Sequence, residues 1–282
     1  MRNVYCVVPI REQIRYRIRT YWHLFRYYKN FMWPHRELLK KTANLRGIHK
    51  GQNAFVFGCG PSLKRLDIQK IKQYQKKEKF NIYAVNAFIN SEFCQEVIPD
   101  YYILSDPQSF KPEKEYSATA SLVWKKLNQY HVPLFVPADL YQQADYQHKF
   151  IFCDQANLYS RNVTDPLSPA GFLSLTVLKA IQIALFMGHE KIYICGVDHD
   201  HFKSLYVDEH NDLYFDDTHF YGGDKKNIYR LKGWEATMMN QFYLSCLVWE
   251  SFARFRHCPI INLNPESFVD TFTKQHDLDV YR

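Results

Sequence analysis

From residue 53 onward, short apolar runs alternate with longer segments whose apolar residues recur every three or four positions. Short runs rich in Val, Ile, Phe and Tyr are typical of strands buried on both faces, and the wider spacing is typical of helices. The runs predict strands at 53–57, 81–85, 101–104, 133–136, 150–152, 191–197 and 259–263. The longer segments predict helices at 62–78, 121–130, 172–187 and 231–256. This alternation predicts a doubly wound α/β domain.

Two of the later segments depart from the simple alternation. The predicted helix 172–187 is apolar nearly all round, which indicates a central helix between the sheet and another layer, ended by Gly188. Residues 199–230 are polar, aromatic and rich in histidine, without clear periodicity. Because a long irregular segment inside a compact domain is often functional, we expect residues 199–230 to form a flexible active-site lid.

The first 50 residues form a separate region in both pattern and charge. Residues 11–50 predict one or two amphipathic helices, broken near Pro34. This region holds 12 Lys/Arg and 2 Asp/Glu, a net charge of +10, and the remaining 24 basic and 27 acidic residues leave the body at −3. We therefore expect a basic, aromatic helical extension at 1–50 and a catalytic domain at 51–282. The weakly acidic body argues against a general nucleic-acid-binding surface.

The extension allows two interpretations. Its aromatic and apolar residues recur at helical spacing with Arg and Lys between them, as in helices that lie on anionic membranes. The same stripe could instead pack on the body or on another subunit, and a homo-oligomer is compatible with the aromatic content of 17%.

The cysteines and the lengths of the apolar runs indicate where in the cell the protein is expected to be. The seven cysteines are dispersed and form no C-x-x-C pair, which fits a reducing compartment and gives no zinc pattern. No apolar run is long enough to span a bilayer, and the N-terminal stretch lacks the apolar length of a secretory signal. We expect a cytoplasmic protein, peripheral at the inner face of a bacterial cytoplasmic membrane.

A glycine-rich turn follows the first predicted strand. After the run at 53–57 come Gly58, Cys59, Gly60, Pro61 and Ser62. Glycines allow close approach of a ligand, Pro suits the first position of a helix, and the amides at a helix start attract anions. The turn is neither a P-loop nor a G-x-G-x-x-G motif. It therefore predicts a nucleotide phosphate site or, equally, a tight turn with no ligand.

Polar residues also follow the other predicted strands. Ligands of open α/β sheets bind beyond the carboxyl ends of the strands, so these residues are candidates for the same site. They are Asn86, Asp106, Asp198, Asp200, Asn262 and Asn264. The expected lid adds His219, and an imidazole is suited to general-base work near neutral pH. Adjacent residues of the stretch Asp198–His201 point in opposite directions along an extended chain, so we expect no metal site there.

Six stretches in order carry a family resemblance: "FGCGPSLKRLD", "YAVNAF", "PDYYILSDP", "ALFMGHEKIYICGVDHD", "THFYGG" and "INLNPES". Together they resemble the bacterial sialyltransferases of glycosyltransferase family 42. They also resemble the broader MptE-like group related to archaeal 6-hydroxymethylpterin diphosphokinase. The likeness covers roughly residues 50–270 and leaves out the basic N-terminus. It implies a Rossmann-like, GT-A-type single domain with a mostly parallel sheet and a flexible lid.

The sialyltransferase resemblance implies metal-free, inverting transfer from a CMP-activated acidic sugar, a nonulosonic acid or Kdo, to a surface glycan. It assigns the CMP phosphate and ribose to Gly58, Gly60, Pro61 and Ser62. It assigns nucleotide or donor-sugar contacts to Asn86 and Asp106, and a small hydroxyl residue to Thr176 or its neighbour Ser174. His219 corresponds to the base that deprotonates the acceptor, with no cofactor beyond the donor itself.

One position departs from the sialyltransferase pattern. Two tyrosines stabilise the leaving phosphate there; Tyr206 matches one by spacing, but Asp200 stands in place of the other. We count Asp198 with His219 and Tyr206 as catalytic candidates and Asp200 with the donor-binding residues, and His199, His201 or Lys203 could supply the missing donor. The departure keeps open an ATP- and Mg²⁺-dependent diphosphokinase using Asp106, Asp198 and Asp200. A third possibility is a non-catalytic nucleotide-binding module that docks on membranes.

Overall fold

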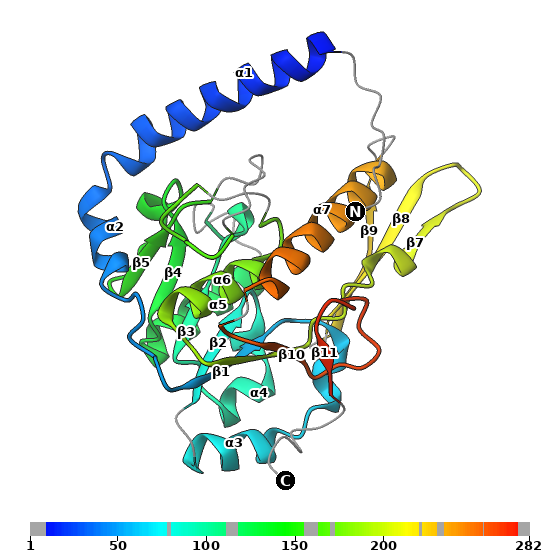
Figure 1. Cartoon of the computed structure of the whole chain (residues 1–282). Helices are drawn as coiled ribbons and strands as arrows, with labels where there is room; N and C mark the ends of the chain where they lie inside the picture. Colours follow the sequence, from blue (N-terminus) through cyan, green and yellow to red (C-terminus); the bar gives the residue numbers. More distant parts are fainter. Residues whose placement is uncertain are drawn as a thin grey trace.

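A computed structural model describes residues 10–77, 80–110, 118–154, 163–169, 173–219, 222–229, 234–255 and 257–275. Its centre is an eight-stranded sheet with the strand order β11-β10-β6-β1-β2-β3-β4-β5 (Figure 1), and every neighbouring pair is parallel. These strands are β1 (Asn53–Phe57), β2 (Phe80–Val85), β3 (Tyr101–Ile103), β4 (Leu134–Pro137), β5 (Lys149–Phe152), β6 (Lys191–Cys195), β10 (Ile260–Asn262) and β11 (Thr273–Lys274). All seven predicted strands are present, and the doubly wound, Rossmann-like α/β prediction is confirmed.

The α-helices connect these parallel strands and cover the sheet. They are α1 (Ile10–Tyr27), α2 (Arg36–Ala43), α3 (Ile68–Lys77), α4 (Glu92–Glu96), α5 (Ala118–Tyr130), α6 (Thr176–Met187) and α7 (Trp234–Ala253). The chain steps from β1 outward to β5, and α6 then returns it to place β6 on the other side of β1. Because parallel crossovers are almost always right-handed, this strand order is expected to put α3, α4 and α5 on one face of the sheet and α6 and α7 on the other. The strand order therefore reverses between β1 and β6.

The predicted central helix is α6. All twelve of its residues are buried, and it packs across β1, β2 and β3. Gly188 ends the helix with a φ of 88°, the left-handed conformation that favours glycine. Two polar side chains inside α6 have buried partners: Lys179 pairs with Asp154 at 2.5 Å, and Gln182 donates to the carbonyl of Val163.

The helix predicted at 62–78 is two elements. Pro61–Arg65 form a short 3₁₀ helix, η2, and the chain is extended at Leu66 before α3 begins at Ile68. Asp67 caps α3, because its Oδ1 accepts hydrogen bonds from the amides of Gln69 and Lys70 at 3.0 and 3.2 Å. The helix that follows the glycine turn is therefore only five residues long.

The segment expected to be an irregular lid contains regular structure. β7 (Leu205–Val207), β8 (Leu213–His219) and β9 (Gly222–Tyr229) form a three-stranded antiparallel sheet that projects from the body (Figure 1). A bulge between Phe215 and Asp217 shifts the register, so the two-residue period that would reveal a strand is broken in the sequence. Residues 220, 221 and 230 of the expected lid lie outside the described residues.

Most of the N-terminal region belongs to the body. Helix α2 packs against the edge strand β5, and the buried Thr42 hydroxyl donates to the carbonyl of Ile151 at 2.8 Å and accepts from its amide at 3.3 Å. Further on, the amides of Gly47 and His49 donate to the carbonyls of Phe186 and Met187 at the end of α6. Residues 36–50 therefore pack on the body, whereas α1 stands away from it (Figure 1).

The helices give no membrane-spanning candidate. Within the described residues, none of them combines the length and the apolar character needed to cross a bilayer.

Candidate functional site

The glycine turn after β1 is closed by contacts with the end of β6. The amides of Gly58 and Gly60 each donate, at 2.8 Å, to the carbonyls of Cys195 and Gly196. A Cβ at Gly58 would lie 2.4 Å from the Gly196 oxygen, and one at Gly60 would lie 2.1 Å from Oδ2 of Asp198. Neither glycine has a positive φ. Close packing between two strand ends therefore explains both glycines without a ligand.

Asp198 supplies the anion that the start of η2 attracts. Its Oδ2 accepts from the Ser62 amide at 3.1 Å, and its Oδ1 accepts from the side-chain amide of Asn264. Asp198 thereby ties the end of β6 to the turns after β1 and β10. The expected phosphate cradle on the bare amides of this turn is not what the structure shows, because these amides already bind protein acceptors. The Ser62 side chain faces a neighbouring pocket shared with Arg65 and Lys70.

A second helix start lies beside this turn and is not closed in the same way. Helix α6 begins at Thr176 without a side-chain cap. Within the described residues, no carbonyl accepts from the amides of Thr176 or Val177. The Thr176 hydroxyl is hydrogen-bonded to Ser105 Oγ at 3.0 Å, which fixes the first turn of α6 against the end of β3. The open N–H groups and the helix dipole make this terminus suited to an anion.

A pocket with a cavity volume of about 120 Å³ lies at this point, where the strand order reverses. Its walls are the ends of β1, β2 and β6, the start of α6 and the end of β8. Of the predicted site residues, those that line it are Gly58, Gly60, Pro61, Asn86, Thr176, Asp198, Asp200 and His219. The rule that ligands of such sheets bind at the reversal therefore located the pocket correctly.

Asn86 is held in this pocket by its backbone. Its φ is 52°, a left-handed conformation that asparagine tolerates better than most residues, and its carbonyl accepts from the Tyr102 hydroxyl at 2.6 Å. The side-chain Oδ1 is buried and has no partner among the described residues. A buried polar atom without a partner is a candidate contact for a ligand.

Two further histidines come to the same pocket as His219. His201 lines it, and His199 is 9% exposed and stacks on the ring of Phe242 at 4.5 Å. Burial, with a smaller effect of His201, lowers the pKa of His199 to about 4, so its imidazole is neutral at pH 7. Its Nδ1 is buried without a partner in the described part of the chain. From the sequence, His199 and His201 were candidates only for the hydrogen-bond donor that a tyrosine provides in the sialyltransferase pattern.

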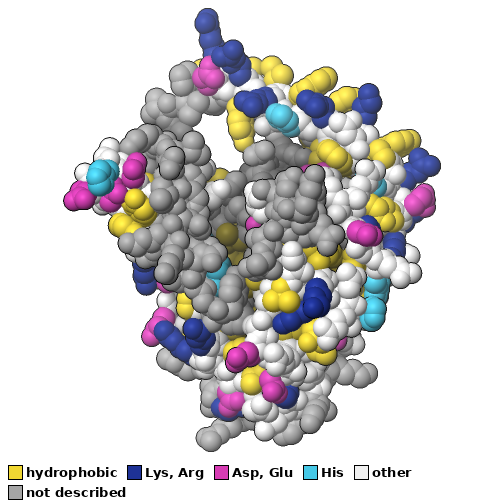
Figure 2. All heavy atoms as spheres, turned by 180° about the vertical axis from the view of Figure 1, so that it is seen from behind, with side chains coloured by type: hydrophobic (Ala, Val, Ile, Leu, Met, Phe, Trp, Pro, Cys, Tyr) yellow, Lys and Arg dark blue, Asp and Glu magenta, His cyan; other side chains and the backbone are white. Residues whose placement is uncertain are grey.

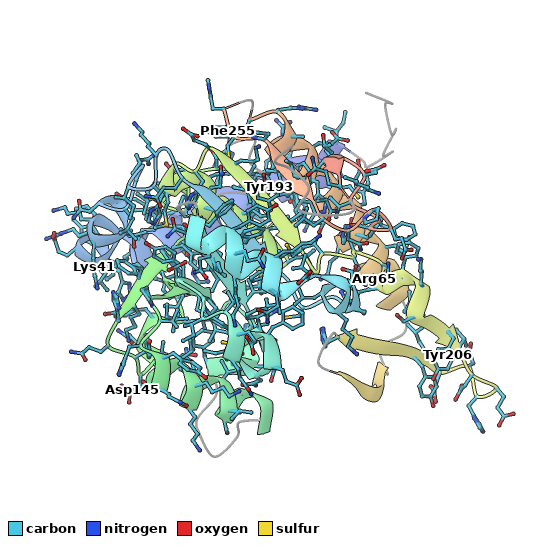
Figure 3. The ribbon with its side chains drawn as sticks, turned by 90° about the horizontal axis from the view of Figure 1, so that it is seen from below. Lys41, Arg65, Asp145, Tyr193, Tyr206 and Phe255 are labelled. Atoms are coloured by element: carbon cyan, nitrogen blue, oxygen red, sulfur yellow. The ribbon has the colours of Figure 1, made fainter. Side chains whose placement is uncertain are left out.

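Four predicted residues are not brought to this pocket. Tyr206 lies on the projecting three-stranded sheet, where its ring stacks on Tyr214 at 5.2 Å (Figure 3). Asp106 is exposed, and its Oδ1 accepts from the amide of Gln108. Ser174 is hydrogen-bonded to Ser245 of α7 at 3.2 Å, and Ser62 faces the neighbouring pocket. Local sequence could not show this, because each placement depends on how distant elements pack.

The carboxylates of the described residues do not gather into a metal centre. Within the described chain, no three His, Cys, Asp or Glu side chains lie where they could hold one ion together. Asp198 and Asp200 share the pocket, but Asp106 lies outside its described lining. The three ligands expected for a diphosphokinase are therefore not assembled in this structure.

Comparison with known proteins identifies a family, and distant structural neighbours are found among solved structures. No curated protein matches the sequence. The structure of MAf glycosyltransferase from Magnetospirillum magneticum AMB-1 aligns with a TM-score of 0.46 and 13% identity, over 86% of this chain and 38% of that one. Residues 29–203, more than half of the chain, match the family described as 6-hydroxymethylpterin diphosphokinase MptE-like. The chain therefore belongs to the MptE-like family.

Proposed function

We propose that this protein is a transferase that moves an acidic sugar from a CMP-activated donor to a hydroxyl of a surface glycan. The observation that carries the proposal is the grouping of His219, Asn86 and the open start of α6 in one pocket. These groups come from three separate parts of the chain and meet at the strand-order reversal. They supply the two things such a transfer needs, a proton acceptor and a site for a leaving phosphate.

The transfer assigns a role to each group. His219 accepts the proton of the acceptor hydroxyl, whose oxygen forms the new bond to the anomeric carbon of the donor sugar. The bond from that carbon to the CMP phosphate oxygen breaks, and the phosphate keeps the electron pair. The backbone amides of Thr176 and Val177, the helix dipole of α6 and the side-chain Nδ2 of Asn86 stabilise the charge that develops on the phosphate.

The size of the pocket agrees with a phosphate at the start of α6, and the lining residues decide which groups have to bind it. None of the described residues that line it is Lys or Arg, so helix amides and neutral side chains have to bind the anion. The carboxylates of Asp198 and Asp200 also line the pocket and would repel a phosphate, and two hydrogen bonds hold that of Asp198 against the turn after β1. A volume of about 120 Å³ suits a phosphate-sized group, with the nucleoside and the sugar extending outward.

The family description favours one other candidate, transfer of a diphosphate from ATP to a hydroxymethyl group. This reaction needs Mg²⁺ held by oxygen ligands. Asp198 and Asp200 line the pocket, but Asp198 is already bound by Ser62 and Asn264. The geometry therefore favours the sugar transfer, and a non-catalytic nucleotide-binding module is the outcome to expect if neither reaction occurs.

Nucleotide binding separates these candidates. Because a ligand that binds only the folded state raises its stability, CMP and CDP should raise the melting temperature without metal, and UDP and ATP should not. A response to ATP only in the presence of Mg²⁺ would favour the diphosphokinase. The variant Asn86→Asp should abolish the CMP shift, because it places a carboxylate beside the phosphate. Asn211→Asp is the matched control, since Asn211 also has a positive φ (59°) but lies in the β7–β8 turn.

The transfer rate of a His219 variant tests the assignment of this residue as the general base. His219→Ala should lower the transfer rate by about 10²- to 10⁴-fold while the CMP shift is retained, because the base acts on the acceptor and not on the nucleotide. His210→Ala is the control, since His210 is exposed in the β7–β8 turn of the same sheet. Full turnover by a folded His219→Ala protein would exclude the proposed mechanism.

A further inference from the structure

Helix α1 presents an apolar stripe that the body does not cover. Its large apolar side chains are widely exposed, including Ile18 at 65%, Trp22 at 58% and Phe25 at 56%. Successive helix residues are about 100° apart, which places these three with Ile10, Ile14 and Tyr21 on one side of α1. A monomeric soluble protein rarely leaves so many large apolar side chains together in water.

Among the residues described, only the C-terminal end of α1 contacts the body, and it does so through the side opposite the stripe. Tyr27, the last residue of the helix, is 3% exposed, and its hydroxyl accepts from the amide of Asp154 at 2.9 Å. Thr20 and Leu24, on the same side as Tyr27, are half-buried. From the helix period, Tyr27 points about 150° away from the middle of the apolar stripe. The buried Tyr27 therefore anchors the C-terminal end of α1 in an orientation that turns the apolar stripe away from the body.

Arginines border the stripe on both sides. Arg15, Arg19 and Arg26 follow one border, Arg17 follows the other, and Arg11 lies within the stripe near the start of the helix, where Glu12 is the single acidic residue of α1. All five arginines are exposed. Figure 2 shows hydrophobic and basic side chains side by side along this helix at the upper edge of the molecule. Exposed aromatic residues continue beyond it at Tyr28 and Trp33.

From this arrangement we infer that α1 is a docking arm that lies in the surface of an anionic membrane. The stripe enters the boundary between headgroups and acyl chains, and the flanking guanidinium groups bind anionic headgroups. A second copy of the chain fits less well, because stripe-to-stripe packing would bring the arginines of both helices together with only Glu12 to offset them. The inference does not depend on which reaction the pocket catalyses.

Sedimentation of the full chain with lipid vesicles tests this inference. The protein should bind vesicles of phosphatidylcholine mixed with phosphatidylglycerol, bind pure phosphatidylcholine far more weakly, and release at high salt. Each arginine contributes about fivefold to the affinity, so the double variant Arg15→Gln, Arg19→Gln should bind about 25-fold more weakly.

Two substitutions at adjacent positions distinguish the contribution of the apolar stripe to vesicle binding from that of the net charge of the helix. Trp22→Glu should weaken binding by about a hundredfold or more, because it removes a buried ring and adds a carboxylate within the stripe. His23→Glu adds the same charge on the far side of the helix and should cost about fivefold at most. Both positions are exposed, so both variants should melt like the parent protein.

Three outcomes would overturn the inference. The first is an intact chain that does not bind anionic vesicles, and the second is a Trp22→Glu variant that binds as well as the parent. The third is a concentration-dependent dimer, seen by light scattering, that Trp22→Glu dissolves while vesicle binding is absent. His219→Ala should bind vesicles like the parent, so failure of the proposed reaction and failure of the arm can be told apart.

Discussion

The substitution Gly60→Ala tests why the turn after β1 requires glycine: either a ligand binds there, or the ends of β1 and β6 pack too closely for a side chain. The φ of −69° and ψ of 154° at Gly60 are accessible to any residue, so Gly60→Ala introduces no backbone strain. The new Cβ would instead lie 2.1 Å from Oδ2 of Asp198 and 2.8 Å from the carbonyl oxygen of Gly196. The Asp198 carboxylate therefore has to move away from the Ser62 amide.

The cost follows from these contacts. Inserting a methyl group into a packed site costs about 1–3 kcal/mol, and losing a hydrogen bond to a charged acceptor costs about 1.5–3 kcal/mol. Partial relaxation leaves an expected loss of about 3 kcal/mol in the free energy of unfolding. For a domain of this size, such a loss lowers the melting temperature by about 6 °C.

Urea denaturation in the absence of nucleotide measures this loss. Gly51→Ala is the control, because Gly51 has a φ of 78° but no atom within 4 Å of its Cβ position, so strain alone should cost about 1 kcal/mol. Combining Gly60→Ala with Asp198→Ala should cost about 1–2 kcal/mol less than the sum of the two single changes, since the second change removes one clash. A Gly60→Ala protein with parental stability that fails only to bind nucleotide would refute this reasoning and restore the ligand explanation.

Two other predictions concern pH and the edge of the sheet. Burial lowers the pKa of His189 to about 3 and that of His199 to about 4, so below the ordinary value of about 6.5 the unfolded chain binds more protons than the folded one. Stability should therefore fall as pH drops from 6.5 to 5, by about 1 kcal/mol per pH unit for each histidine, and His199→Phe should remove about half of the slope in urea melts. Thr42→Val should cost about 2–3 kcal/mol, because it leaves the amide and carbonyl of the buried Ile151 without their side-chain partner. Thr42→Ser keeps the hydroxyl and should recover most of that loss; equal losses in the two variants would contradict the assigned role.

The order and type of the main elements could be predicted from the sequence because each depends on a local pattern. A parallel strand buried on both faces, such as Asn53–Phe57, is a short apolar run in any context. A helix buried on all sides, such as Thr176–Met187, is apolar throughout and ends at a glycine. The position of the pocket also followed from sequence, because the carboxyl ends of parallel strands meet at one edge.

The antiparallel sheet and the break in the helix at 62–78 were missed for local reasons. The bulge after Phe215 interrupts the alternation that reveals a strand. The break before α3 had a usable signal in Asp67, an N-cap residue, but the apolar spacing across it resembles one continuous helix.

Only the tertiary structure decided which polar groups are already hydrogen-bonded within the protein and which surfaces are left for a ligand or a membrane. The Ser62 amide is closed by Asp198, 136 residues away in the sequence, so a local motif could not reveal that the expected phosphate site was filled. The outward direction of the α1 stripe likewise depends on Tyr27 reaching Asp154, 127 residues further along. The sequence thus determined the helices and strands, and it showed that polar residues follow the carboxyl ends of the strands. The tertiary arrangement determined how those residues pair, because segments far apart in the sequence meet only where the assembled sheet brings them together.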